Sequence, residues 1–371
     1  MESLPLHDFH KSIGARFTAA GDAGHVADYG DPGAEYHALR NSAGILDLSN
    51  RGRLCLVGED RQRFLNGQVT NNLKDLPAGR GCYAALVNAK GKIQSDLNIH
   101  VLPDEILLDF EPGLSEAVTR RLDHYIIADD VRIVDVSSTH GLLSVQGPRA
   151  ADVLGAMNPP LPLPAQSHDI ARVDHERFGE LYVVNLPRGT AAGFDLFLAS
   201  EVLGPAMEQL IQAARSVEGC PCGWSALETV RIESGIPRFG ADMDETNLAP
   251  EAGLEERAIS YSKGCYIGQE VIARIRTYGQ VAKSLRGLEL SGSSTQLPGR
   301  GDKLNHDGKE VGHITSAVHS PALGRNIALG YVRKEVNQPG TPLIVRTPHG
   351  EETATLVPLP FAKANSRGQK E

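Results

Sequence analysis

The chain has 371 residues, of which 41% are hydrophobic and 22% are charged. This composition is typical of a globular protein whose core is large enough to need no disulfide bonds. The formal net charge of -9 argues against a general role in binding nucleic acid or membrane surfaces, because such partners favour basic patches.

The cysteine content predicts a reducing compartment and no metal centre. Cys55, Cys82, Cys220, Cys222 and Cys265 are spread along the chain, and Cys220 and Cys222 are closer together than zinc ligands usually are. The N-terminus lacks the basic start and apolar core of a signal peptide, and no apolar run is long enough to span a membrane. We therefore expect a cytoplasmic protein.

The first part of the chain predicts a mixed lobe of strands and helices from about residue 52 to 136. Short or alternating apolar runs predict strands, and apolar residues spaced three or four apart predict helices. Strands are expected at 54–58, in a pair from Tyr83 to Leu102 that turns at Lys90-Gly91, at 105–110 and at 131–136, with helices at 59–69 and 114–127.

The middle of the chain predicts further strands and helices in alternation. A strand at 142–148 leads into a helix for which Pro148 suits the first turn, and the proline-rich stretch 158–166 predicts an extended connection. Later elements are strands at 180–186 and 193–199, a helix at 201–215, and a helix that the capping pattern Ser225 to Glu228 opens and that ends near 235–237.

The C-terminal part predicts a small all-β domain from about residue 282 to 361. Short strand patterns alternate with glycine, proline and aspartate turns, and Asp307-Gly308 is a strong hairpin signal. Residues 362–371 are expected to form a mobile tail. The chain as a whole is therefore expected to belong to the α+β class, with a C-terminal β-barrel or sandwich.

Asp96, Asn98 and His100 share one face of a predicted strand, whereas Leu97, Ile99 and Val101 share the other. Two interpretations stand for the polar face. It is either a solvated surface, the more common case, or a polar wall of a ligand pocket in which Asp96 manages a proton.

Two other charged residues are weaker candidates from the sequence alone. Arg231 follows Glu228 by three positions on a predicted helix, which fits a surface ion pair, but its guanidinium is also suited to an anionic ligand. Asp195 alternates with Phe194 and Leu196 on a strand, so burial of its carboxylate is not required.

Cys265 lies in the segment KGCYIGQE at 263–270, two residues after Lys263 and just before a predicted helix. Positive charge and a helix N-terminus both favour the thiolate form, so Cys265 is a candidate reactive thiol. The alternative is an inert cysteine in a tight loop. Gly264 and Gly268 allow unusual backbone angles on either side.

The segment KGCYIGQE resembles the signature of the YgfZ-type folate-binding proteins, which are relatives of the aminomethyltransferase of the glycine cleavage system. The resemblance covers nearly the whole chain. Further segments that resemble motifs of the wider superfamily are RFLNGQVTNNL, LVNAKGKIQSDLNIH, LLSVQGP, RIESGIPRFGADM and VGHITSAVHSPALGRNIALGYV.

The resemblance implies a three-lobed ring in which two mixed α/β lobes surround a central pocket for tetrahydrofolate or a one-carbon derivative. Residues 1–281 would form the two interleaved lobes, and residues 282–361 a β-barrel that closes the pocket. By the same resemblance, Asp96 is the pocket carboxylate near the reacting nitrogens, with Asn98 on the same face. Tyr83 and Asp195 would contact the pterin, and Arg231 would contact the folate.

In the YgfZ family Cys265 would act near the pocket mouth as a thiolate, a redox group or a contact for a partner. Lys263 would lower the pKa of its thiol. The supporting residues of the motif are Gly264, Tyr266, Gly268, Gln269, Glu270 and Arg274.

The resemblance makes a folate-binding protein that supports maturation or repair of iron–sulfur enzymes the first expectation, with iron–sulfur enzymes or assembly proteins as partners. Two departures keep alternatives open. Asp96 is acidic where the YgfZ branch often has another residue, which favours an aminomethyltransferase or a folate-dependent demethylase. The loop PRGTAAGFD at 187–195 lacks the glycine, tyrosine and glutamate usual in aminomethyltransferases, which favours a non-catalytic scaffold.

Overall fold

The computed structural model describes residues 4–18, 24–189, 191–279, 281–291 and 296–361. The chain divides into two compact units. The first unit comprises residues 1–86, 95–228 and 258–267, and the second comprises residues 87–94, 229–257 and 268–371.

The compact units interleave along the chain, so they do not follow a linear division at residue 282. Segments 87–94, 229–257 and 268–281 group with the C-terminal strands rather than with the N-terminal lobes. The division into family domains at 281/282 stays a prediction, and the predicted tail at 362–371 lies outside the described residues.

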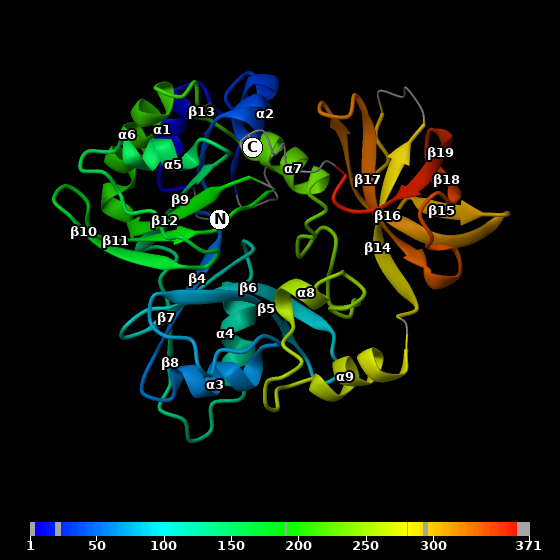
Figure 1. Cartoon of the computed structure of the whole chain (residues 1–371), viewed down its shortest axis with the longest axis horizontal. Helices are drawn as coiled ribbons and strands as arrows, with labels where there is room; N and C mark the ends of the chain where they lie inside the picture. Colours follow the sequence, from blue (N-terminus) through cyan, green and yellow to red (C-terminus); the bar gives the residue numbers. More distant parts are fainter. Residues whose placement is uncertain (1–3, 19–23, 190, 280, 292–295, 362–371) are drawn as a thin grey trace, which may run out of the picture. The chain divides into compact units, whose positions relative to one another are not determined.

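The first unit contains a five-stranded sheet in the order β5-β6-β7-β4-β8 (Figure 1). Helices α3 and α4 cover an apolar core to which strand residues such as Leu54 and Leu97 contribute together with Leu65 of α3 and Leu122 of α4. The elements are β4 (Gly52–Val57), α3 (Arg61–Gln68), β5 (Arg80–Val87), β6 (Ile93–Val101), β7 (Ile106–Phe110), α4 (Ser115–Asp123) and β8 (Arg132–Asp135).

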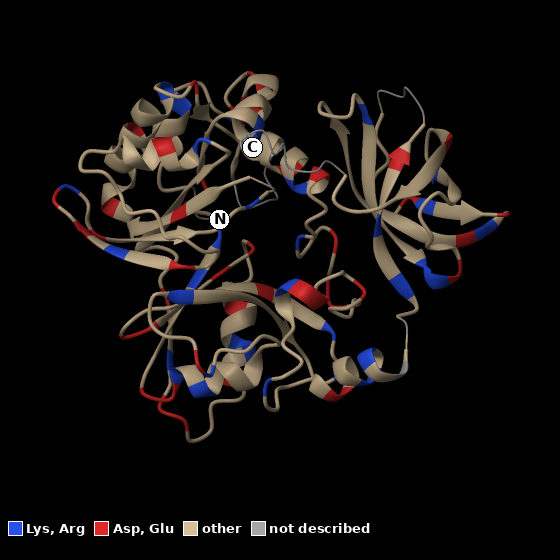
Figure 2. Ribbon diagram, in the orientation of Figure 1, with Lys and Arg blue, Asp and Glu red and all other residues tan. Residues whose placement is uncertain are grey.

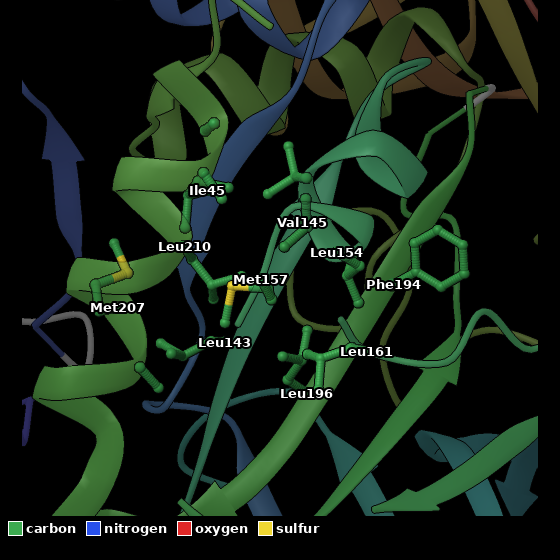
Figure 3. Close-up of a cluster of buried hydrophobic side chains, with 14 of the residues drawn as sticks. Ile45, Leu143, Val145, Leu154, Met157, Leu161, Phe194, Leu196, Met207 and Leu210 are labelled. Carbon is green, nitrogen blue, oxygen red and sulfur yellow. The ribbon is translucent and has the colours of Figure 1, made fainter. Parts of the chain in front are cut away.

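A six-stranded sheet in the order β10-β11-β12-β9-β3-β13 forms the other lobe of the first unit. In Figure 3, Met207 and Leu210 of helix α6 lie near Ile45, Leu143 and Met157 in its apolar core. The elements are β3 (Gly44–Asp47), β9 (His140–Gln146), α5 (Ala150–Gly155), β10 (Ile170–His175), β11 (Gly179–Asn185), β12 (Gly193–Ala199), η1 (Ser200–Val202), α6 (Leu203–Arg215) and β13 (Cys220–Pro221).

Short elements precede these sheets in the chain and follow them. The N-terminal segment, for which the sequence predicted no element in detail, holds α1 (His7–Ser12), β1 (Arg16–Phe17), β2 (Val26–Asp28) and α2 (Pro32–Asn41). After the six-stranded sheet come α7 (Trp224–Glu233), which spans the boundary between the units, α8 (Glu255–Ala258) and α9 (Gln269–Tyr278).

The second unit contains a closed barrel in the order β14-β17-β16-β15-β18-β19. Its hairpin β15–β16 turns at Asp307 and Gly308, which have φ of 47° and 74°, as a two-residue turn with two left-handed positions requires. The elements are β14 (Lys283–Leu290), β15 (Lys303–His306), β16 (Lys309–Ser320), β17 (Arg325–Arg333), η2 (Lys334–Val336), β18 (Pro342–Thr347) and β19 (Gly350–Val357).

These elements confirm the α+β prediction of two mixed lobes and a C-terminal β-barrel. The helix predicted at 114–127 ends early, at Asp123, although Tyr125 and Ile126 still pack on the same core and so extend the apolar spacing. Pro148 lies before the helix that it was expected to open, because α5 begins at Ala150. The sequence missed β10, an edge strand whose side chains are mostly half-buried or exposed and therefore show no clear apolar alternation.

The lengths and hydropathy of the helices bear on membrane association. Across the described ranges, no helix is both long enough and apolar enough to cross a membrane.

Figure 2 shows acidic and basic residues mixed over the ribbons of both sheets of the first unit, so neither sheet presents a single sign of charge.

Gly268, which precedes α9, is a position that requires glycine. Its φ is 82°, and a Cβ atom there would lie 2.5 Å from the carbonyl oxygen of Asn88. By contrast, a Cβ on Gly264 would meet no atom within 4 Å, and Gly264 is not among the glycines with positive φ.

We predict that Gly268→Ala lowers the free energy of unfolding by about 1–3 kcal/mol, because alanine is strained at this φ and its Cβ displaces the backbone of Asn88. Gly264→Ala, four residues earlier in the same segment, should change it by less than about 0.5 kcal/mol. Urea denaturation of both variants measures the difference in unfolding free energy. Equal losses of stability in the two variants would contradict the requirement for glycine at position 268.

Candidate functional site

The polar face of β6 was predicted from the alternation of residues 96 to 101, and the structure confirms that alternation. Leu97 and Ile99 are fully buried on one face, whereas Asp96 and Asn98 are only partly buried on the other. His100 departs from the expected polar wall, because it is fully buried and its ring lies 5.2 Å from that of Phe197. Burial lowers the pKa of His100 to about 3, so its imidazole is neutral and belongs to the core.

Asp96 is the carboxylate of this face that is least satisfied by the protein. The hydroxyl of Tyr83, on the neighbouring strand β5, donates to its Oδ2 at 2.8 Å. Its Oδ1 is buried and accepts no hydrogen bond from the described residues. Burial, reinforced by the negative charge of Glu111, raises the pKa of Asp96 to about 6, so the group can gain or lose a proton near neutral pH.

Asp109 on β7 is the carboxylate of the same face that is fully satisfied. Asn98 Nδ2 donates to its Oδ2 at 2.9 Å, and Arg51 Nε donates to its Oδ1 at 2.7 Å. Burial alone would raise the pKa of Asp109, but the charges of Arg51 and Arg188 outweigh burial and hold it well below the usual range. Arg51 also donates to Glu111 at 2.5 Å, so one arginine neutralises two acids.

Asp195 on β12 lies in the other sheet, and the structure places it differently from the sequence. It is fully buried, although the strand pattern did not require burial. Its Oδ1 accepts from the hydroxyl of Ser144 at 2.6 Å, and its Oδ2 accepts from Arg188 at 2.5 Å. Burial raises the pKa of Asp195 while Arg188 opposes that effect.

Arg188 joins the two sheets of the first unit. Besides Asp195, its guanidinium contacts Asp109 Oδ2 at 3.3 Å, so it bridges two carboxylates that are both inaccessible to solvent. The backbone N–H of Arg188 donates to Gln146 at 2.9 Å, which fixes the loop that carries it. The contact of Asp195 with a pterin stays a prediction.

The cysteine segment is built around Lys263 rather than around the thiol. The buried ammonium of Lys263 donates to the carbonyl oxygens of Asn66, Val69 and Asn71 at 2.6–2.7 Å, which uses all three of its N–H bonds. It also lies 5.0 Å from the ring centroid of Tyr266, which is buried. Burial lowers the pKa of Lys263 to about 8.

The expected role of Lys263 as the cation that activates Cys265 therefore has no support in the geometry. Cys265 itself is exposed, and α9 begins four residues later at Gln269, as the sequence predicted. Glu270 and Arg274 pair with each other at 2.6 Å on the exposed side of α9, and their support of the loop stays a prediction. A catalytic role of Cys265 stays a prediction.

Arg231 belongs to the second unit, and it is not the surface residue that its spacing from Glu228 allowed. It is 6% exposed. Its NH1 donates to Asp242 Oδ2 at 2.6 Å and to the carbonyl oxygen of Ile236 at 2.5 Å. Asp242 is held in turn by the hydroxyls of Thr315 and Ser316, at 2.6 and 2.7 Å. Contact of Arg231 with a ligand stays a prediction.

The candidate site of the first unit thus brings Tyr83, Asp96, Asn98 and Asp195 together with residues that sequence reasoning missed, and the ligand contacts of the four stay predictions. Four of the missed residues are charged, and the fifth, Ser144, carries a hydroxyl. One signal was available, because a carboxylate within the apolar run ILLDF needs a buried partner. The missed residues are Arg51, Asp109, Glu111, Ser144 and Arg188.

Metal chemistry has no candidate ligand set in the part of the chain that the structure describes. No group of three or more His, Cys, Asp or Glu side chains there is arranged to hold a metal ion.

Comparison with known proteins assigns the family. The model of the GCVT N-terminal domain matches residues 6–263, and that of the glycine cleavage T-protein C-terminal barrel domain matches residues 283–363. The chain therefore belongs to the aminomethyltransferase superfamily.

Full-length relatives agree with this assignment. The aminomethyltransferase of Chlorobium luteolum is 28% identical over 369 residues, which are 98% of this chain and 100% of the relative. That of Cutibacterium acnes is 30% identical over 377 residues, 98% of this chain and 99% of the relative. The fold also matches the crystal structure of glycine cleavage system aminomethyltransferase T from Bartonella henselae, with a TM-score of 0.87, 22% identity and 98% coverage of both chains.

These findings confirm the superfamily and correct the function expected first. The prediction of a YgfZ-type protein that supports iron–sulfur enzymes is wrong, because the full-length relatives are named aminomethyltransferase. That prediction depended on one segment of eight residues, in which Lys263 and Tyr266 serve the packing of the loop. The findings favour the alternative, an aminomethyltransferase.

The raised pKa of Asp96 predicts a pH-dependent stability difference between the wild type and Asp96→Asn. The unfolded carboxyl ionises near pH 4, whereas the folded one holds its proton to about pH 6. Stability of the wild type therefore falls as pH rises from about 4 to about 6 and is constant above, so the asparagine variant gains by up to about 3 kcal/mol over this window. Asparagine can still accept from Tyr83.

Urea denaturation at several pH values measures this difference. Asp104→Asn, which removes an exposed carboxylate in the turn after β6, controls for the loss of one negative charge. A difference between Asp96→Asn and the wild type that stays constant from pH 4 to pH 7 would show that Asp96 does not titrate in this range.

Proposed function

We propose that the chain is a folate-dependent aminomethyltransferase, which moves a one-carbon unit from an aminomethyl carrier to tetrahydrofolate. The observation that carries the proposal is Asp96, an acid with a pKa of about 6 whose buried Oδ1 accepts no hydrogen bond from the described residues. Family membership and the names of the full-length relatives support the same reaction.

The residues around Asp96 fit tetrahydrofolate as the ligand. A buried carboxylate oxygen without a hydrogen bond is costly, so Oδ1 of Asp96 favours a ligand that brings an N–H donor. Tetrahydrofolate carries such N–H groups, and its amine nitrogens take up the one-carbon unit. Tyr83 already occupies Oδ2, which leaves Oδ1 as the acceptor for the ligand.

The protein's own contribution would be orientation and control of one proton. An acid with a pKa near 6 is protonated in part and ionised in part close to neutral pH, so it can both accept a proton from an amine and return it. The hydroxyl of Tyr83 holds the carboxylate in a single orientation. Asp109 cannot share this role, because Arg51 and Arg188 keep it ionised.

The remaining predicted residues take proposed roles of binding rather than of proton transfer. Asn98 would line the same face, Asp195 would act together with Arg188, and Arg231 would contact the folate. The residues 282–361 would form the barrel domain, and a cytoplasmic location would match the five free cysteines.

The proposal predicts that Asp96→Asn lowers turnover with an aminomethyl-lipoyl carrier and tetrahydrofolate by about 10²–10⁴-fold, because the amide cannot accept and return a proton. Tetrahydrofolate binding should weaken less than turnover, because the substitution removes one hydrogen bond to the ligand but abolishes proton transfer. Anaerobic calorimetry measures binding, and formation of methylene-tetrahydrofolate measures turnover.

Asp104→Asn is the matched control, since it removes an exposed carboxylate of the same lobe and should leave both quantities unchanged. Wild-type protein that binds tetrahydrofolate but shows no turnover with the aminomethyl carrier would contradict the proposed reaction. Wild-type protein that does not bind tetrahydrofolate would contradict the ligand as well.

A further inference from the structure

Cys220 and Cys222 form a pair of thiols in the first unit that the proposed reaction does not use. Their sulfur atoms lie 4.0 Å apart. Both are free thiols, and they differ in access: Cys220 is partly exposed, whereas Cys222 is buried. An exposed thiol in contact with a buried one is the arrangement that intramolecular thiol exchange needs.

The backbone holds the two thiols together. The N–H of Cys220 donates to the carbonyl oxygen of Ala43 at 3.2 Å, and the N–H of Cys222 donates to that of Ile45 at 2.8 Å. Residues i and i+2 of an extended segment point to the same face, and Pro221 between them restricts the backbone further. The two side chains therefore lie side by side on one face of the strand.

The surroundings of Cys222 leave room for its sulfur only because residue 44 is glycine. A Cβ atom on Gly44 would lie 2.7 Å from the Sγ of Cys222. The Sγ also lies within hydrogen-bond range of the carbonyl oxygens of Glu35 and Cys220, at 3.4 and 3.5 Å. Cys222 is thus fixed beneath Cys220 rather than free to turn away.

The two thiols also differ in acidity. The hydrogen bond from Cys222 lowers the pKa of Cys220, whereas burial raises that of Cys222 well above its usual range. Cys220 is therefore the thiol that attacks the reagent first, and Cys222 is the thiol that attacks Cys220 in the second step.

We propose that Cys220 and Cys222 are a thiol–disulfide exchange site, at which a small-molecule disulfide oxidises the pair to an intramolecular disulfide. The Cys220 thiolate attacks one sulfur of the reagent, the S–S bond of the reagent breaks, and one thiolate leaves. Cys222 then loses its proton to solvent and attacks Sγ of Cys220, which releases the second thiolate. The protein loses two electrons and two protons, and the reagent becomes two thiols.

The distance between the sulfurs is compatible with this closure. A disulfide needs about 2.05 Å between the sulfurs, so each Sγ has to move by about 1 Å, which rotation about the Cα–Cβ bonds can supply. Trp224, the one tryptophan of the chain, lines the same small cavity as Cys222. Its fluorescence is therefore an intrinsic reporter of the change.

The test uses full-length Cys265→Ser protein, because Cys265 is exposed and would react independently. Burial raises the pKa of Cys82 to about 12 and raises that of Cys55 further, so neither competes. Glutathione disulfide is the probe, and intact mass, peptide mapping and Trp224 fluorescence are the measurements. Cys82→Ser in the same background is the matched control for loss of one half-buried thiol.

We expect the Cys265→Ser protein to lose two hydrogen atoms without a lasting adduct and to yield a peptide linked through Cys220 and Cys222. Its Trp224 fluorescence should change on oxidation and return to the starting value with dithiothreitol. Cys222→Ser in this background should keep one glutathione on Cys220, and Cys220→Ser should stay unmodified at Cys222. The Cys82→Ser control should behave as its parent.

Two results would overturn the proposal: a stable adduct on Cys220 while Cys222 is present, or no reaction at Cys220 in the parent protein. If Cys222→Ser does not fold, the mass and peptide map of the parent protein, which has both cysteines, are sufficient to test the proposal. The outcome is independent of the proposed aminomethyltransferase activity, because no residue near Asp96 takes part.

Discussion

Two buried aspartates from different sheets, Asp109 and Asp195, share the guanidinium of Arg188. Neither carboxylate is accessible to solvent, so each would carry a large desolvation cost without this cation. The bridge fixes β7 against β12, and Arg51 completes the neutralisation of Asp109. The bridge therefore joins the two sheets of the first unit, and Asn98 on the polar face of β6 is tied to it through Asp109.

This network divides the acids of the site into two kinds. Asp109 is held ionised by two arginines. Asp96 lies on the neighbouring strand β6, two residues before Asn98, the cross-strand partner of Asp109, and it has a tyrosine as its hydrogen-bond donor and a pKa raised to about 6. Acids whose environments push their pKa values apart take different roles, one structural and the other available for proton transfer. The proposed reaction therefore depends on Asp96, whose pKa stays near 6, as much as on Asp109, which the arginines keep ionised.

The sequence predicted the features that depend on local pattern, such as strand faces and turns. It did not predict the contacts between residues that are far apart in the chain. Alternation placed Asp96 and Asn98 on one face of β6, and Asp307-Gly308 located a barrel hairpin. No local pattern shows that Arg188 meets Asp109, 79 residues earlier. Likewise, Lys263 beside Cys265 indicated an activated thiol, whereas its ammonium binds three carbonyl oxygens almost 200 residues earlier in the chain, from Asn66 to Asn71.

A crystal structure of the protein with tetrahydrofolate tests the central claim most directly, because the claim concerns one oxygen atom. The account predicts a ligand N–H within about 3 Å of Oδ1 of Asp96, with Tyr83 still bonded to Oδ2. Tetrahydrofolate bound with Oδ1 still lacking a ligand donor, or bound away from β6, would contradict the assignment of Asp96 as the acid that handles the proton.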